Sequence, residues 1–138
     1  MNFKFPKDFL FGCASSAYQI EAGAKEGGKG ESVSDHYHTL YPEKYCGGDP
    51  AFAADFYHRY REDIKDMKEM GLKSFRFSIA WTRIFPNGPT EVCQAGIDYY
   101  NDMINALIEA DIVPLFDLFH SDLPYWVIEM GGIINPDF

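Results

Sequence analysis

The order of apolar patterns along the chain is the feature that most restricts its fold. Five segments carry a regular pattern, in the order strand, helix, strand, helix, strand, and a long irregular segment follows the first strand. Strands that alternate with helices of this length are joined by right-handed crossovers, which place the strands parallel in one sheet. The sequence therefore predicts an α/β fold built on a parallel sheet.

The three predicted strands differ in their apolar pattern. Residues 9–14 are short and apolar and are closed by Gly12 and two serines, which predicts a buried strand running into a loop. Residues 75–81 alternate and predict a strand with Phe75, Phe77, Ile79 and Trp81 on one face. Residues 113–120 are almost continuously apolar, which is typical of a strand buried on both faces.

The two predicted helices carry apolar stripes. Asp49-Pro50 supplies an N-cap and a proline at the first helical position, and the helix predicted from there ends at Gly71. Its stripe consists of Phe52, Phe56, Tyr60, Ile64 and Met67. The second helix ends near Ala110, with a stripe of Ile97, Tyr100, Ile104, Leu107 and Ile108. Residues 23–48 lack periodicity and predict a long loop, a kind of segment that is usually functional.

Three strands make an incomplete parallel sheet. Such a sheet normally has both faces covered and its edges protected, whereas here the third strand would be an open apolar edge. We therefore expect residues 1–138 to form the opening part of one larger α/β domain, either a barrel or a doubly wound sheet, without a second domain.

Charge and composition exclude several classes of function. The chain has 12 Lys plus Arg against 21 Asp plus Glu, a net charge of -9, which disfavours nucleic acid and anionic membranes as partners. Apolar residues make up 46% and can sustain a packed core. The aromatic content of 17% fits either core packing or a surface on which ligands stack.

The cysteine pattern indicates the compartment. Cys13, Cys46 and Cys93 are odd in number, far apart and without CxxC spacing, which argues against a disulfide framework and a zinc site. The first residues do not resemble a signal peptide, and no stretch is apolar enough to span a bilayer. We expect a cytoplasmic protein with free thiols. His36 and His38 have no third ligand nearby, so no metal is predicted.

Three polar residues are candidates for a functional site. His120 follows the last apolar strand directly, where parallel α/β folds place their sites. Arg76 lies inside a strand between two phenylalanines, so it needs a carboxylate partner, either in a structural ion pair or at a site. Gln19 follows the first strand and suits hydrogen bonding to hydroxyls, although such a residue alone is more often part of a loop. Asp117 is expected on the strand face opposite His120, so that it does not converge with Asp122.

Four stretches, in this order and spacing, resemble the N-terminal third of the family 1 glycoside hydrolases, the β-glucosidase and 6-phospho-β-glucosidase family. They are FPKDFLFGCASSAYQIEA, GKGESVSD, DFYHRYREDIKDMKEMGLKSFRFSIAWTRIFPNG and PLFDLFHSDLPYW. The resemblance implies a (β/α)8 TIM barrel, of which residues 1–138 supply about the first three strands and two helices. The activity it implies is that of a retaining β-glycosidase acting on β-linked glucosides or galactosides or on their 6-phosphates, without a cofactor.

The resemblance also implies roles for individual residues. The residues matching Gln19 and His120 bind hydroxyls of the substrate sugar, and the residue matching Arg76 supports the ionised nucleophile. Glu21, Trp81 and Arg83 match family positions too and are expected to be mainly structural. Ser121 stands where the family usually has a tryptophan, so the shape of the sugar pocket, and with it the substrate preference, is open.

Neither catalytic glutamate of the family is present in these 138 residues. Both the Asn-Glu-Pro segment and the Thr/Ser-Glu-Asn-Gly segment that carry them are absent, so we expect residues 1–138 alone to be inactive. One alternative is a non-catalytic truncated or split fragment that needs the C-terminal part of the barrel as a partner to fold. A weaker one is an acidic sugar-binding protein that uses its aromatic residues for stacking.

Overall fold

The computed structural model describes residues 4–136 and contains one three-stranded parallel sheet. The strands β1 (Gly12–Ala14), β2 (Ser74–Ser78) and β3 (Val113–Asp117) lie in the order β1-β2-β3. Gly12 pairs with Ser74 and Ser74 with Val113, so the three strands start at the same level. The predicted parallel α/β architecture is confirmed, and β3 is an open edge of the sheet among the described residues.

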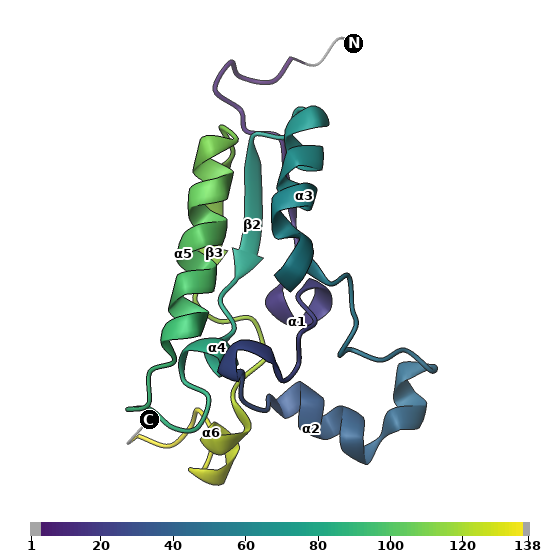
Figure 1. Cartoon of the computed structure of the whole chain (residues 1–138), viewed down its shortest axis with the longest axis vertical. Coiled ribbons are helices and arrows are strands. Elements are labelled where there is room, and N and C mark those ends of the chain that lie inside the picture. The colour runs from purple at the N-terminus through teal and green to yellow at the C-terminus, as the bar shows by residue number, and fades with distance from the viewer. Residues whose placement is uncertain (1–3, 137–138) are drawn as a thin grey trace.

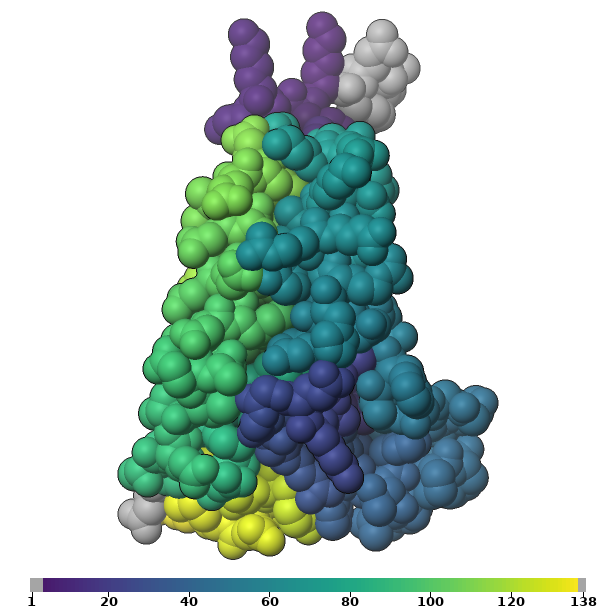
Figure 2. Space-filling model, in the orientation of Figure 1, coloured from purple at the N-terminus to yellow at the C-terminus, as the bar shows by residue number. Residues whose placement is uncertain are grey.

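Two long helices cover one face of this sheet. They are α3 (Phe56–Glu69) and α5 (Gln94–Glu109), which lie side by side along the strands (Figure 1) and hide the sheet in the space-filling view (Figure 2). Phe75 and Phe77 of β2 point into this layer and are almost fully buried. The main core cluster is Ala17, Phe56, Ile64, Phe75, Phe77, Ala80, Tyr99, Tyr100, Met103, Leu107 and Ile112. The core therefore lies between the sheet and the helix pair.

The other face of the sheet is polar near its centre and apolar along β3. Because side chains alternate along a strand, Arg76 and Ser78 point away from the helices that cover Phe75 and Phe77. On this face Val113 and Leu115 of β3 remain exposed by 42% and 46%. Phe116 lies on the helix side, in register with Phe77, and is also 54% exposed. Burial of β3 on both faces was predicted, and residues 4–136 do not provide it.

Shorter elements gather at the ends of the strands (Figure 1). They are α1 (Ala17–Ile20), the 3₁₀ turns η1 (Glu26–Gly28) and η2 (Pro42–Tyr45), α2 (Val33–Leu40), α4 (Trp81–Ile84) and α6 (Tyr125–Glu129). The backbone N–H of Ala17 donates to Ser78 Oγ at 2.8 Å, which ties α1 to the end of β2. This end of the sheet is therefore the one that carries the connecting segments.

The prediction that residues 23–48 form a loop was wrong, because the segment contains α2. No residue of α2 is buried, so it lacks the burial pattern that identifies most helices. Its start is stabilised locally by a capping box: Ser32 Oγ accepts from the Asp35 N–H at 3.0 Å, and the Asp35 carboxylate accepts from the Ser32 N–H at 2.9 Å. The Ser-x-x-Asp spacing was the signal that could have revealed this helix.

Element boundaries also differ from the prediction in three places. The first helix begins at Phe56 rather than near Asp49, because Ala53 and Asp55 have positive φ angles and interrupt the chain; Phe52 is consequently exposed. The second strand ends at Ser78, and Trp81 belongs to α4. The first and third strands are shorter than the apolar runs that predicted them. An apolar run shows which residues can be buried and does not show where hydrogen bonding between strands stops.

Candidate functional site

Three side chains meet at the C-terminal end of the sheet. Arg76 from β2 donates through Nη2 to the carboxylate of Asp117, the last residue of β3, and the same Nη2 lies 3.1 Å from Nδ1 of His120. His120 Nδ1 lies 3.6 Å from Asp117 Oδ2. All three side chains are between one third and two fifths exposed. The cluster is therefore held by the protein and open to a ligand.

The contact with Arg76 determines the tautomer of His120. A guanidinium has only donors, so Nδ1 of the imidazole must accept in this contact. The ring proton of the neutral imidazole then lies on Nε2. His120 is thereby oriented to offer an N–H donor to a hydroxyl group of a ligand.

The expected separation of Asp117 from His120 was wrong. It assumed that the strand continues to residue 120, whereas β3 ends at Asp117 and the chain turns, with Ser121 at a positive φ of 66°. The alternation of sides no longer applies beyond the end of a strand, so both side chains reach Arg76. This also identifies the carboxylate partner that Arg76 requires within the chain.

Gln19 lies on α1 at the same end of the sheet and is exposed (Figure 1). Its Oε1 accepts a hydrogen bond from Ser16 Oγ at 2.8 Å. This contact orients the amide and leaves its NH₂ group available to donate. No hydrogen bond between described residues joins Gln19 to Arg76 or His120, so these residues share one end of the sheet without direct contact.

A buried ionic network holds the residues that directly follow α1. Arg83 donates through Nε to Glu21 Oε2 at 2.7 Å and through Nη2 to the Ala22 carbonyl at 2.9 Å. Tyr100 Oη donates to Glu21 Oε1 at 2.7 Å. Arg83 and Glu21 are buried, and none of these hydrogen bonds involves Arg76, Asp117 or His120. Their contacts agree with the expectation that Glu21 and Arg83 are structural.

Asp122 is a buried acid, and its burial was not predicted from the sequence. It is 5% exposed, and burial raises its pKa from 3.8 to about 6. Asp122 shares a small cavity with α1 residues, whereas Asp117 does not line that cavity. Within the described part of the chain, no hydrogen bond or shared cavity joins the two carboxylates, which agrees with the expectation that they do not converge.

Within residues 4–136, no three His, Cys, Asp or Glu side chains are grouped so that they could hold a metal ion. None of the helices in this range has the length and apolar character needed to cross a membrane. The three cysteines are free thiols.

The parallel strands, their helical crossovers and the polar cluster at the C-terminal strand ends define the opening part of a (β/α)8 barrel. The model of glycosyl hydrolase family 1 matches residues 1–138, and the chain belongs to this family.

Proteins similar to this chain are found both by sequence and by structure. A chloroplastic benzoxazinyl glucoside β-D-glucosidase of Triticum aestivum is 53% identical over 134 residues, which are 96% of this chain and 24% of the relative. β-Glucosidase A of Acetivibrio thermocellus is 50% identical, over 96% of this chain and 30% of its own length. The solved structure of aphid myrosinase matches with a TM-score of 0.92 and 46% identity, over 97% of this chain and 29% of that chain. The chain thus spans 24–30% of the length of these relatives.

Proposed function

We propose that this chain supplies the sugar-binding edge of a retaining β-glycosidase barrel that acts on β-linked glucosides, galactosides or their 6-phosphates. The observation that carries this proposal is the cluster of Arg76, Asp117 and His120, in which His120 presents an Nε2–H donor. Two further points support the proposal. The chain belongs to glycosyl hydrolase family 1, and the cluster lies at the C-terminal strand ends, where barrels of this type carry out their chemistry.

Each candidate residue has a distinct role in the proposed site. His120 donates to one sugar hydroxyl and the Gln19 amide to others, because both side chains are exposed and oriented by neighbours. Arg76 contacts His120 and favours an ionised carboxylate placed beside it. In this site Asp117 holds Arg76 in place.

The chemical step needs groups that residues 1–138 do not contain. A retaining glycosidase uses two carboxyl groups about 5 Å apart, one as nucleophile and one as acid and base. Neither of the family's glutamate segments occurs in the sequence. We therefore propose that residues 1–138 bind and position the sugar, while carboxylates from outside this range perform the chemistry.

The test is a chimeric barrel in which residues 1–138 replace the matching part of the Acetivibrio β-glucosidase A. This chimera should hydrolyse a chromogenic β-glucoside, whereas residues 1–138 alone should show no turnover. His120→Ala and Gln19→Ala should each lower kcat/KM by roughly 10- to 100-fold, the range for losing a hydrogen bond strengthened in the transition state.

His38→Ala is the matched control, because His38 lies on α2 and its ring contacts Tyr45 instead of the polar cluster. Its kcat/KM should equal that of the unmodified chimera. Unchanged kcat/KM in both His120→Ala and Gln19→Ala would remove these residues from the site. Turnover by residues 1–138 alone would contradict the assignment of the chemistry to other carboxylates.

A further inference from the structure

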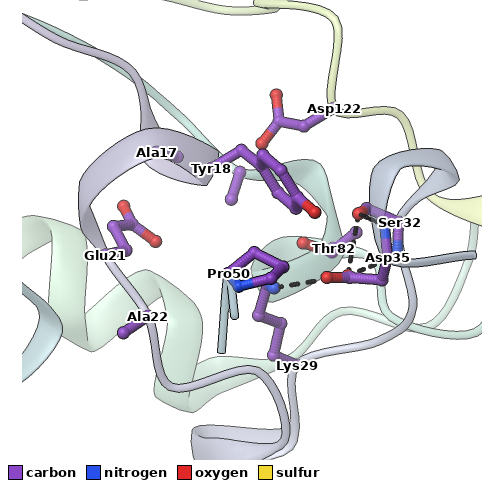
Figure 3. A pocket seen from close by; sticks show the side chains of 11 residues that line it. Ala17, Tyr18, Glu21, Ala22, Lys29, Ser32, Asp35, Pro50, Thr82 and Asp122 are labelled. Carbon is purple, nitrogen blue, oxygen red and sulfur yellow. Dashed lines mark hydrogen bonds and ion pairs between the residues drawn. The ribbon is translucent and has the colours of Figure 1, made fainter. Parts of the chain in front are cut away.

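A small polar cavity lies between α1, α4 and the segment that precedes α2. Figure 3 shows its lining, with Tyr18 reaching in from α1, Thr82 from α4, and Lys29 and Asp35 from the opposite side. The space open to the centre of a water molecule is about 10 Å³. A cavity needs about this much room to hold one water molecule.

Two hydroxyl groups in this cavity lack hydrogen-bond partners among the described residues. They are Tyr18 Oη and Thr82 Oγ1, and both atoms are shielded from bulk solvent. Thr82 is fully buried. Burial, and after it the neighbouring Tyr45 hydroxyl, raises the pKa of Tyr18. Tyr45 donates to the Ser34 carbonyl and does not line the cavity, so Tyr18 Oη still has hydrogen-bonding capacity on the cavity side. A buried hydroxyl without a partner destabilises the folded state by about 1–3 kcal/mol, so two of them facing one cavity require an explanation.

The Lys29 ammonium is a further hydrogen-bond donor in the lining of this cavity. Lys29 is largely buried, and its ammonium lies 3.6 Å from Asp35 Oδ2, too far for a direct hydrogen bond. The Asp35 carboxylate meanwhile accepts from the N–H and the hydroxyl of Ser32. The ammonium therefore keeps donors that a water molecule in the cavity can accept.

We propose that one ordered water molecule is a permanent part of this cavity, hydrogen-bonded to Tyr18 Oη and Thr82 Oγ1 and lying within reach of the Lys29 ammonium. The water joins three segments that are distant in sequence: α1, α4 and residues 29–35. It holds the irregular segment before α2 against the barrel sheet. The inference does not depend on the proposed glycosidase activity.

Substitutions that remove one hydroxyl without changing the shape of the side chain test the proposal. The bound water reverses the sign of the change in melting temperature that each substitution is expected to cause. In a dry cavity, Tyr18→Phe and Thr82→Val would each remove an unpaired polar group and leave the melting temperature unchanged or higher. With the water bound, each variant takes away one of its partners. The melting temperature of the 138-residue chain should then fall by about 3–6 °C in each variant.

Tyr99→Phe is the matched control. Tyr99 Oη also lacks a partner among the described residues, but it is buried in the core and does not line the cavity. Its substitution should leave the melting temperature unchanged or raise it. The Tyr18→Phe/Thr82→Val double variant should fall by less than the sum of the single variants, since both depend on the same water.

A crystal structure of the unmodified chain tests for the water molecule directly and does not depend on whether the variants fold. It should show one water oxygen about 2.6–3.2 Å from both Tyr18 Oη and Thr82 Oγ1. An empty cavity in well-defined density would overturn the proposal. So would a melting temperature that rises in Tyr18→Phe and Thr82→Val as it does in Tyr99→Phe.

Discussion

At the scale of single residues, buried charges near α1 are stabilised in two different ways. Arg83 and Glu21 form a complete network, in which the guanidinium also lies 3.9 Å from the centre of the Tyr57 ring. A buried ion pair of this kind is tolerated because its donors and acceptors find partners. Asp122 is almost as buried but forms no ion pair with a described residue, and burial raises its pKa.

The raised pKa of Asp122 predicts a pH dependence of stability. Its folded pKa of about 6 exceeds the ordinary 3.8, so the folded chain holds the proton more tightly than the unfolded chain does. The resulting stabilisation is present below about pH 4 and is lost as the pH rises to about 6. Above this range the ionised carboxylate costs the folded state about 2–3 kcal/mol.

Asp122→Asn should remove this dependence. Urea unfolding at pH 7 should show the variant to be more stable than the unmodified chain, and the two should converge near pH 4. Asp111→Asn is a useful control. Asp111 is exposed, and its hydrogen bond with Lys73 lowers the pKa of the Asp111 carboxyl instead of raising it. A stability difference for Asp122→Asn that does not change between pH 4 and pH 7 would show that Asp122 is not a buried acid with a raised pKa.

At the scale of elements, the start of α3 is joined to the turn η1 through His58. His58 Nδ1 lies 2.6 Å from Asp55 Oδ1, and Nε2 lies 2.8 Å from Glu26 Oε2. Only the protonated imidazole can donate to both carboxylates at once. Hydrogen bonds to Asp55 and then to Glu26 accordingly raise the pKa of His58 above 6.5.

This contact predicts that η1 loosens at alkaline pH. Because the folded pKa of His58 is raised, its stabilising contribution is complete below about pH 6.5 and is lost as the pH rises through the folded pKa. Hydrogen exchange at the Glu26 and Lys29 amides, corrected for intrinsic rates, should become faster over that interval. In His58→Phe the corrected rates should be high at both ends of the range. Equal protection of the unmodified chain at pH 6 and pH 9 would contradict the role of His58.

At the scale of the whole molecule, the chain leaves part of a barrel wall uncovered. The helices bury one face of the sheet, whereas the edge strand β3 exposes Val113, Leu115 and Phe116. An exposed apolar edge strand is a template for pairing with another chain. Within the barrel that we propose, the same edge pairs with the next strand, and the exposed side chains pack inside the wall.

The 138-residue chain in isolation should therefore associate. Sedimentation should show a weight-average mass that grows with concentration, and Leu115→Lys should reduce this growth several-fold because it places a charge on the edge strand. Met70→Lys is the matched control, since Met70 is 75% exposed but lies at the end of α3 away from β3. A chain that stays monomeric at all concentrations would contradict the prediction.

Prediction from the sequence succeeded where short-range spacing decides the structure. The spacing of Phe56, Ile64 and Leu107 identified the buried sides of two helices, and the alternation around Phe75 and Phe77 identified the buried face of β2. It failed for α2, which is held by a capping box and not by burial. It also failed for the position of Asp117, because that depends on where β3 stops.

The sequence by itself determined the order of the three strands and the two long helices, the parallel α/β class and the family, since spacing within a segment and the motifs are local properties of the chain. Only the tertiary structure decided that Asp117 pairs with Arg76, that His120 Nδ1 contacts Arg76, and that Tyr18 and Thr82 line one cavity. These contacts join residues about 40 to 60 positions apart. They depend on strand register and on backbone turns such as the one at Ser121, which side-chain spacing along a single segment does not encode.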